Sequence, residues 1–238
     1  MQVVEKITEI IALMSSDPTK KYWRGTEISQ QLNINVSTTH RLLQSLKNSG
    51  FVYQDMETKK YTLGMNLIYY AEMVREMNIP GIIIHPLMQR LHEAFGETVF
   101  ITIKEGDSCI VIERINSYHQ LRLVKQIGET KLLHEGPCGK VILAYLPDEI
   151  SHRIIHTSSN KEYLISTIKE IQENGYLIEY YDHIDCTIIS APVITPQNYI
   201  IASISVAVPR CRMTSNLSEK IVTLLKEVSS KYRNGCYT

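Results

Sequence analysis

Residues 28–64 hold the pattern that most constrains the fold of this 238-residue chain. Helical spacing of apolar residues predicts a helix over Val3–Met14, a short helix over Thr26–Leu32 and another over Val36–Asn48. Asn33 stands between the last two, where a turn needs a residue that tolerates left-handed dihedral angles. Residues 51–53 and 61–63 follow as two short strands around a polar tip. Helix, tight turn, helix and hairpin in this order predict a winged helix-turn-helix.

The helix over Val36–Asn48 divides into an apolar stripe and a polar face. The stripe consists of Thr39, Leu42, Leu43 and Leu46. Capping by Asn35 or Ser37 is one interpretation of the small polar residues in the first turn. Capping does not explain the whole polar face, since hydroxyls reach phosphates and Arg or Gln can read base edges. We therefore predict DNA contacts in the major groove, with two lysines at the hairpin tip on the phosphate backbone: Ser37, Thr38, His40, Arg41, Gln44, Lys59 and Lys60.

Charge and composition limit the class of protein. The net charge is zero, and residues 1–64 hold eight Lys or Arg against six Asp or Glu, a local charge of +2. This is weak support for DNA binding, so the placement of the charges has to carry the prediction. Five unpaired cysteines, no signal peptide and no apolar run of ~18 residues predict a cytoplasmic protein without a membrane partner.

The remaining chain mixes helices and strands. A linker helix is expected over Met65–Asn78, ending at Ile79 and Pro80. Further helices are expected over 82–95, 138–146, 161–174 and 218–232. Strands are expected over 97–104, 109–115, 121–126, 176–181, 186–195 and 199–208. Hairpin pairing among these strands predicts an α+β class with an antiparallel sheet. The boundaries predicted for the parts are 1–64, 65–78 and 79–238.

A loop that leads directly into a helix suggests an anion site. Pro137 suits a first helical turn, and the backbone N–H groups of Cys138, Gly139 and Lys140 would point at a carboxylate. Gly139 lets a ligand approach the backbone closely. The alternative is that Gly139 only lets the helix pack on the sheet.

These motifs resemble the IclR family of bacterial transcription regulators over nearly the whole chain. The resemblance is carried by Ser37-Thr38-Thr39-His40-Arg41-Leu42-Leu43, Gly50-Phe51-Val52 and Tyr61-Thr62-Leu63-Gly64. Thr39 replaces the usual valine. The resemblance implies a GAF-like, profilin-like sensor domain, a linker helix that helps dimerisation, a homodimer or homotetramer, and a roughly palindromic double-stranded DNA operator.

The resemblance also implies a pocket for a small organic-acid effector. The positions carried over are Pro137, Cys138, Glu179, Ile188, Ser205 and Ala207. Here Ile188 stands where cysteine is frequent and Ala207 where serine is frequent. A pocket with fewer hydroxyls should prefer a more apolar ligand than the smallest oxoacids. Together with Gly139, these residues form the predicted effector site.

The sequence gives little support for catalysis, metal binding or nucleotide binding. His134 and Cys138 could be imagined as a nucleophile pair, but no orienting third group accompanies them. Asp182-His183-Asp185-Cys186 has metal-ligand residue types without tetrahedral spacing, and nucleotide-cradling glycine loops are absent. We predict no cofactor, no metal and no catalysis. Two alternatives stay open: an enzyme of small acids centred on Cys138, and a DNA-binding oligomer whose sensor domain has lost its ligand.

Overall fold

The computed structural model describes residues 3–17, 19–78 and 81–233, without the side chains of 75–78, 81–83, 183 and 231–233. The chain divides into two compact units, Met1–Pro80 and Gly81–Thr238. The boundary predicted after residue 78 falls at residues 79 and 80, outside the described residues. No helix within the described residues is long and apolar enough to cross a membrane.

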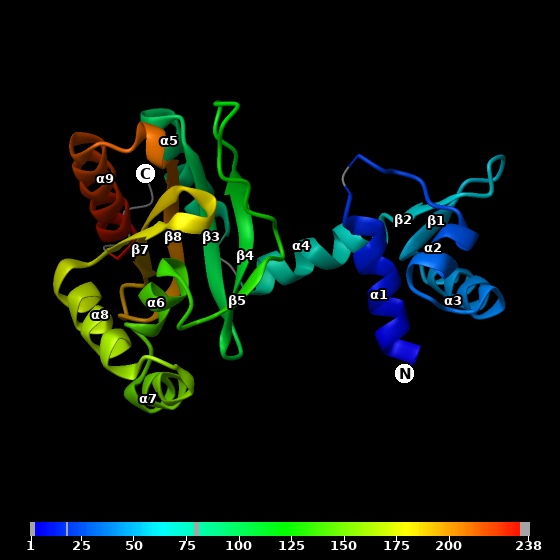
Figure 1. Cartoon of the computed structure of the whole chain (residues 1–238), viewed down its shortest axis with the longest axis horizontal. Helices are drawn as coiled ribbons and strands as arrows, with labels where there is room; N and C mark the ends of the chain where they lie inside the picture. The colour runs from blue at the N-terminus through cyan, green and yellow to red at the C-terminus, as the bar shows by residue number, and fades with distance from the viewer. Residues whose placement is uncertain (1–2, 18, 79–80, 234–238) are drawn as a thin grey trace. The chain divides into compact units, whose positions relative to one another are not determined.

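The first unit is a helix-turn-helix with a hairpin (Figure 1). Its elements are α1 (Val3–Ser15), α2 (Gly25–Gln31), α3 (Val36–Asn48), β1 (Val52–Gln54), β2 (Tyr61–Leu63) and α4 (Asn66–Asn78). β1 and β2 pair antiparallel. The backbone of Trp23 adds a bridge, because it exchanges two 2.8 Å hydrogen bonds with Tyr61. The predicted winged helix-turn-helix is confirmed.

The core of this unit follows the predicted helical stripe. Thr39, Leu42, Leu43 and Leu46 of α3 are buried. The three leucines pack with Trp23, Tyr61 and other apolar residues of α1, α2 and β1. The Thr39 hydroxyl, the one polar group of the stripe, donates to the Asn35 carbonyl at 3.2 Å. Asn33 has φ +51°, the left-handed conformation that the turn requires.

The second unit is built on an antiparallel sheet with strand order β5-β4-β3-β8-β7-β6. The strands are β3 (Thr98–Glu105), β4 (Ser108–Ile115), β5 (Thr130–Leu132), β6 (Leu177–Tyr181), β7 (Cys186–Ile194) and β8 (Ile200–Pro209). The helices are α5 (Gly81–Phe95), α6 (Pro137–Leu143), α7 (Asp148–Thr157), α8 (Lys161–Asn174) and α9 (Ser215–Arg233). Short 3-10 turns lie at Asp182–Ile184 and Arg210–Arg212. The α+β class is confirmed.

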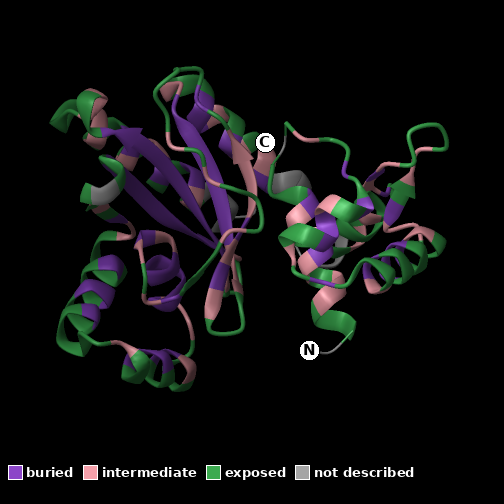
Figure 2. Ribbon diagram, turned by 45° about the vertical axis from the view of Figure 1, so that its right-hand side comes forward, coloured by how far each residue is buried: buried purple, intermediate pink, exposed green. Residues whose placement is uncertain are grey.

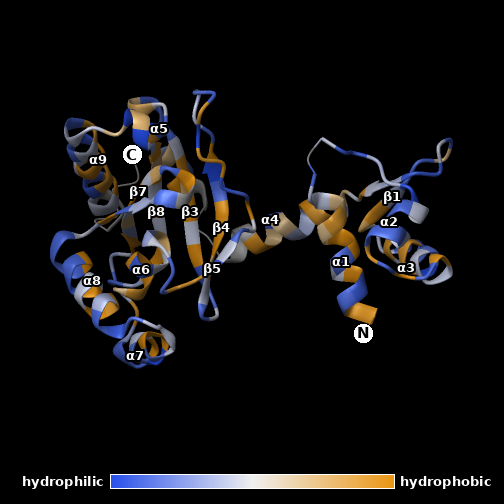
Figure 3. Ribbon diagram, viewed as in Figure 1, coloured by the Kyte–Doolittle hydropathy of each residue, from blue (hydrophilic) through white to orange (hydrophobic). Residues whose placement is uncertain are grey.

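Burial explains why the sheet is the core of this unit. Every residue of β7 is buried, and Figure 2 shows the central strands buried along most of their length. Such a strand needs cover on both faces. α9 contacts β7, whereas α6 contacts β3, β7 and β8. The helices are apolar on one side and polar on the other (Figure 3), as expected for helices that cover a sheet.

Two expectations for this unit need correction. The strand predicted over 121–126 is wrong: this segment forms no strand, and the sheet edge beside β4 is β5 instead. The reason lies in the backbone partners, because the carbonyls of Leu121, Leu123 and Lys125 accept hydrogen bonds from side chains. The helix α7 was not predicted. The strand β5 was not predicted either, and the remaining helices and strands begin and end within about three residues of the expected positions.

Candidate functional site

The outward face of α3 is set by its inward leucines. Ser37, His40, Arg41 and Gln44 are exposed, and Thr38 is half-buried. Asn35 caps the helix, because its side chain accepts hydrogen bonds from the Ser37 N–H at 2.9 Å and the Ser37 hydroxyl at 2.8 Å. Asn35 is therefore the capping residue, and Ser37 binds the Asn35 side chain through both its N–H and its hydroxyl.

The remaining side chains of this face differ in how they are held. The amide of Gln44 donates to Asn48 at 3.0 Å, one turn along α3. Within the described residues Arg41 makes no hydrogen bond or ion pair through its side chain. His40 packs against the start of α2, where a Cβ on Gly25 would lie 3.2 Å from its ring. Arg41 is thus an exposed guanidinium without a competing partner.

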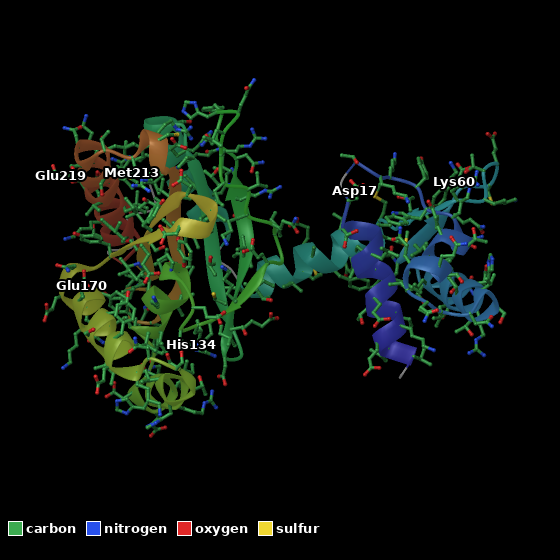
Figure 4. All side chains as sticks on the ribbon, viewed as in Figure 1. Asp17, Lys60, His134, Glu170, Met213 and Glu219 are labelled. Atoms are coloured by element: carbon green, nitrogen blue, oxygen red, sulfur yellow. The ribbon has the colours of Figure 1, made fainter. Side chains whose placement is uncertain are left out.

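The hairpin tip carries the two predicted lysines, Lys59 and Lys60. The Asp55 carboxylate accepts hydrogen bonds from the N–H and the hydroxyl of Thr58, both at 2.7 Å. These bonds lower the pKa of Asp55. Lys59 is exposed with φ +57°, and Lys60 is half-buried (Figure 4). Lys47 of α3 donates to Gln54 of β1 at 3.1 Å, which ties the hairpin to the helix.

The second unit contains a cavity of about 430 Å³, counted with its open mouth. Three of the seven predicted effector residues line it: Pro137, Cys138 and Ile188. Eleven further lining residues were not predicted. They are Phe100, Thr102, Cys109, Val111, Lys125, Glu129, Lys131, Glu135, Gly136, Tyr181 and Ile184. Lys131, Glu135 and Gly136 lie within a few residues of the predicted Pro137, whereas the others come from strands and loops far apart in the chain and are brought together by strand pairing.

The other four predicted residues lie outside the cavity lining. Ser205 is fully buried, and its hydroxyl lies 3.4 Å from the Cys138 sulfur and 2.8 Å from the Ser190 hydroxyl. Ala207 belongs to a buried apolar cluster that includes Ile188. Gly139 faces backbone, because a Cβ there would lie 2.6 Å from the Leu133 carbonyl oxygen. Gly139 thus lets α6 approach the turn after β5, and its predicted role in effector binding stays a prediction.

Glu179 is the centre of a polar network that reaches the cavity lining through Tyr181. Its carboxylate pairs with the Lys140 ammonium and accepts a hydrogen bond from Tyr163 at 3.5 Å. Tyr181, which lines the cavity, also bonds to Glu179, and burial together with this carboxylate raises the pKa of the Tyr181 phenol. The Tyr181 hydroxyl occupies the space where a Cβ of Gly136 would lie. Glu179 thus positions a lining residue.

Fewer backbone N–H groups are free to bind an anion at the start of α6 than the sequence predicted. Pro137 occupies the first turn of α6, as predicted. The N–H of Lys140 already donates to the Gly136 carbonyl at 3.1 Å, so it is not available to an anion. The backbone N–H groups of Cys138 and Gly139 are the remaining members of the predicted set.

The thiols show no arrangement for nucleophilic chemistry. The Cys138 sulfur contacts the hydroxyls of Ser205 and Ser190, and no hydrogen bond joins it to His134 within the described residues. Burial raises the pKa of Cys109 to about 12, which keeps this thiol neutral. Among the described residues no group of three potential ligands could hold a metal ion. Asp185 instead accepts a hydrogen bond from Tyr180 at 2.5 Å.

Comparison with known proteins assigns both units. The family described as "Bacterial transcriptional regulator IclR C-terminal" matches residues 71–233, and the "IclR helix-turn-helix domain" matches residues 3–56. The regulator KdgR of Dickeya chrysanthemi is 27% identical over 220 residues, 84% of this chain and 69% of that protein. The repressor IclR of Escherichia coli is 25% identical over 224 residues, 87% of this chain and 82% of that protein.

A solved structure extends this likeness to the whole fold. It is an IclR homologue from Microbacterium hydrocarbonoxydans complexed with 4-hydroxybenzoate. It superposes with a TM-score of 0.77 at 17% identity and covers 99% of each chain. At this identity the likeness concerns the fold alone.

Proposed function

The chain belongs to the IclR family of bacterial transcriptional regulators, and from that premise we propose how it works. Helix α3 and the β1–β2 hairpin hold one operator half-site. A small organic acid in the cavity of the second unit modulates operator binding or the geometry of the dimer. The family consists of DNA-binding regulators with an effector-binding C-terminal domain and is not enzymatic. The enzyme alternative for Cys138 is therefore set aside.

The observation that carries the DNA-binding half is the division of α3 into two faces. Leu42, Leu43 and Leu46 are fixed in the core, so Arg41 and Gln44 point to solvent. A guanidinium can bind a guanine edge with paired hydrogen bonds, and a glutamine can do the same for adenine. Ser37, Thr38 and His40 extend this face, and in this proposal Lys59 and Lys60 contact phosphates.

The effector half rests on the cavity and on one relative. The lining combines apolar side chains such as Phe100, Val111 and Ile188 with a few polar groups, which is typical of small-molecule sites. Since a related protein was solved in complex with 4-hydroxybenzoate, an organic acid is the class of ligand we propose. Such an acid can shift DNA affinity only by its differential affinity for the two states of the regulator.

A homodimer or homotetramer completes the proposal. Helix α4 and the residue before it expose large apolar side chains, including Met65 (80% exposed), Ile68 (59%) and Val74 (57%). Exposed apolar patches of this kind mark interaction surfaces. A dimer would present two copies of α3 to a roughly palindromic operator.

The test uses a duplex selected from a random library with the full-length chain. Arg41→Ala should weaken binding by about tenfold to a hundredfold in fluorescence anisotropy, the effect of losing a base-reading arginine. Arg153→Ala, an exposed arginine of α7, is the matched control and should change nothing. Addition of organic acids, including 4-hydroxybenzoate, should change the affinity of the wild type. An Arg41→Ala chain that binds like the wild type would refute the proposed recognition face.

A further inference from the structure

Two lysines and two glutamates line the cavity, and one lysine forms an ion pair with one glutamate. Four charged side chains contribute to the lining: Lys125, Glu129, Lys131 and Glu135. Lys125 and Glu129 pair with each other at 2.5 Å. Lys131 and Glu135 are both exposed, and neither makes a side-chain hydrogen bond or ion pair within the described residues. Beside the same cavity, one cation and one carboxylate are therefore left without an ion-pair partner among the described residues.

The fold directs both of these side chains to the cavity. Lys131 lies opposite Cys109 in the β4–β5 register, and directly opposed residues project to the same face of a sheet. Cys109 lines the cavity, and the Lys131 ammonium lies 5.6 Å from the ring centroid of Tyr181, another lining residue. Glu135 stands in the turn that leads into α6, directly before the lining residues Gly136, Pro137 and Cys138.

Part of the cavity lining is apolar. Phe100, Val111 and Ile188 are buried apolar side chains, and the thiol of Cys109 stays neutral because burial raises its pKa to about 12. Burying an unpaired charge among such groups is unfavourable. The charges of Lys131 and Glu135, which make no ion pair within the described residues, favour a position near them for the charged part of a ligand, and the apolar side chains favour a mostly apolar remainder.

We infer that the effector is a zwitterion, namely an amino acid with an apolar side chain. Its carboxylate binds Lys131, its ammonium group binds Glu135, and its side chain packs on Phe100, Val111 and Ile188. A ligand with a carboxylate alone would gain Lys131 but face repulsion from Glu135. Both side chains are long and unpaired, so their charged ends can meet groups carried by one carbon atom. This inference rests on the proposed function, which takes the cavity as the effector site.

Calorimetric titration of the full-length chain tests the inference with two matched sets of probes. The first set is L-leucine, 4-methylpentanoate and 3-methylbutylamine. The second is L-phenylalanine, 3-phenylpropanoate and 2-phenylethylamine. Each amino acid should bind more tightly than the acid that lacks its amine and the amine that lacks its carboxylate. Lys131→Met and Glu135→Gln should each weaken amino-acid binding by about threefold or more, within the range of partly exposed ion pairs.

The most discriminating variant is Glu135→Gln, because it should change the two affinities in opposite directions. Glu135→Gln should weaken binding of the amino acid and at the same time strengthen binding of the acid without the amine. Lys169→Met and Glu170→Gln, exposed on α8 and outside the cavity lining, serve as controls and should alter neither. Preference for the acids without an amine would overturn the inference and leave an organic-acid effector standing. Binding of none of the six probes would also overturn it, while a response of DNA affinity to other acids would still uphold the proposed function.

Discussion

Two buried hydroxyl groups oppose each other on β3 and β8 without a hydrogen-bond partner in the described residues. Thr102 is 2% exposed and Ser203 is 0% exposed, and they are cross-strand neighbours. A buried hydroxyl without a partner destabilises a protein by about 1–3 kcal/mol. We therefore expect Thr102→Val, which keeps the shape of the side chain, to raise the free energy of unfolding by about 1 kcal/mol in urea denaturation.

Thr167→Val is the matched control for this substitution. Thr167 is also buried, but its hydroxyl donates to the Tyr163 carbonyl at 2.8 Å. Its replacement should lower the free energy of unfolding, because a made hydrogen bond is lost. A loss at Thr102 as large as the loss at Thr167 would contradict the expectation, since it would mean that a bound water molecule satisfies the Thr102 hydroxyl.

At the residue scale, sequence predicts what depends on near neighbours. The buried stripe of α3 and the left-handed Asn33 follow from helical periodicity and turn chemistry, and both predictions are confirmed. The surroundings of Gly139 and Glu179 depend instead on distant segments. Glu179 is engaged by Lys140 and by tyrosines, and no local pattern encodes that network. Their effector-binding roles stay predictions.

At the element scale, side chains from other segments hold the backbone over 121–126, where a strand was expected. Thr98 donates to the Leu123 carbonyl and Arg212 to the Leu121 carbonyl, each at 2.9 Å. Apolar residues such as Leu121 and Val124 suggested a strand, yet both are exposed. Strand patterns record side-chain character, whereas strand formation also needs a free neighbouring edge. Here β5 already occupies the edge of β4.

The anchor of this segment is an ion pair whose carboxylate is buried. Glu97 is 2% exposed and accepts two hydrogen bonds from Arg212, at 2.5 and 2.8 Å. Arg212→Met would leave a buried carboxylate uncompensated, so we expect the free energy of unfolding to fall by about 3 kcal/mol. The double variant Glu97→Gln with Arg212→Met should lose less than the sum of the two single variants. Strict additivity in this double-mutant cycle, measured by urea denaturation, would contradict the coupling.

At the scale of the whole molecule, sequence predicts class more readily than topology. The amphipathic elements and the hairpin signals predict two kinds of domain, and the α+β class is confirmed. The strand order could not be predicted in the same way. β8 lies between β3 and β7, although about 95 residues separate it from β3 along the chain. That pairing brings Phe100, Thr102 and Ile188 to one cavity. Local periodicity contains no information about such distant pairing.

The proposed dimer leads to a prediction about the spacing of the two operator half-sites, which a single chain would not give. Two copies of α3 that read a two-fold symmetric site must lie about one DNA turn apart, ~34 Å. Insertion of five base pairs between the selected half-sites turns one of them to the opposite side of the duplex. We expect this insertion to weaken binding by about a hundredfold in fluorescence anisotropy, because the second contact loses its high effective concentration.

A duplex with a single half-site provides the reference for that loss. It should bind about as weakly as the duplex with the five-base-pair insertion, since both leave one copy of α3 without its site. An insertion of ten base pairs keeps both half-sites on one side and should bind more tightly than the five-base-pair insertion whenever the linked units can span the added length. Equal affinity for all spacings would mean that each chain binds alone. The exposed apolar face of α4 would then need a role other than joining two copies.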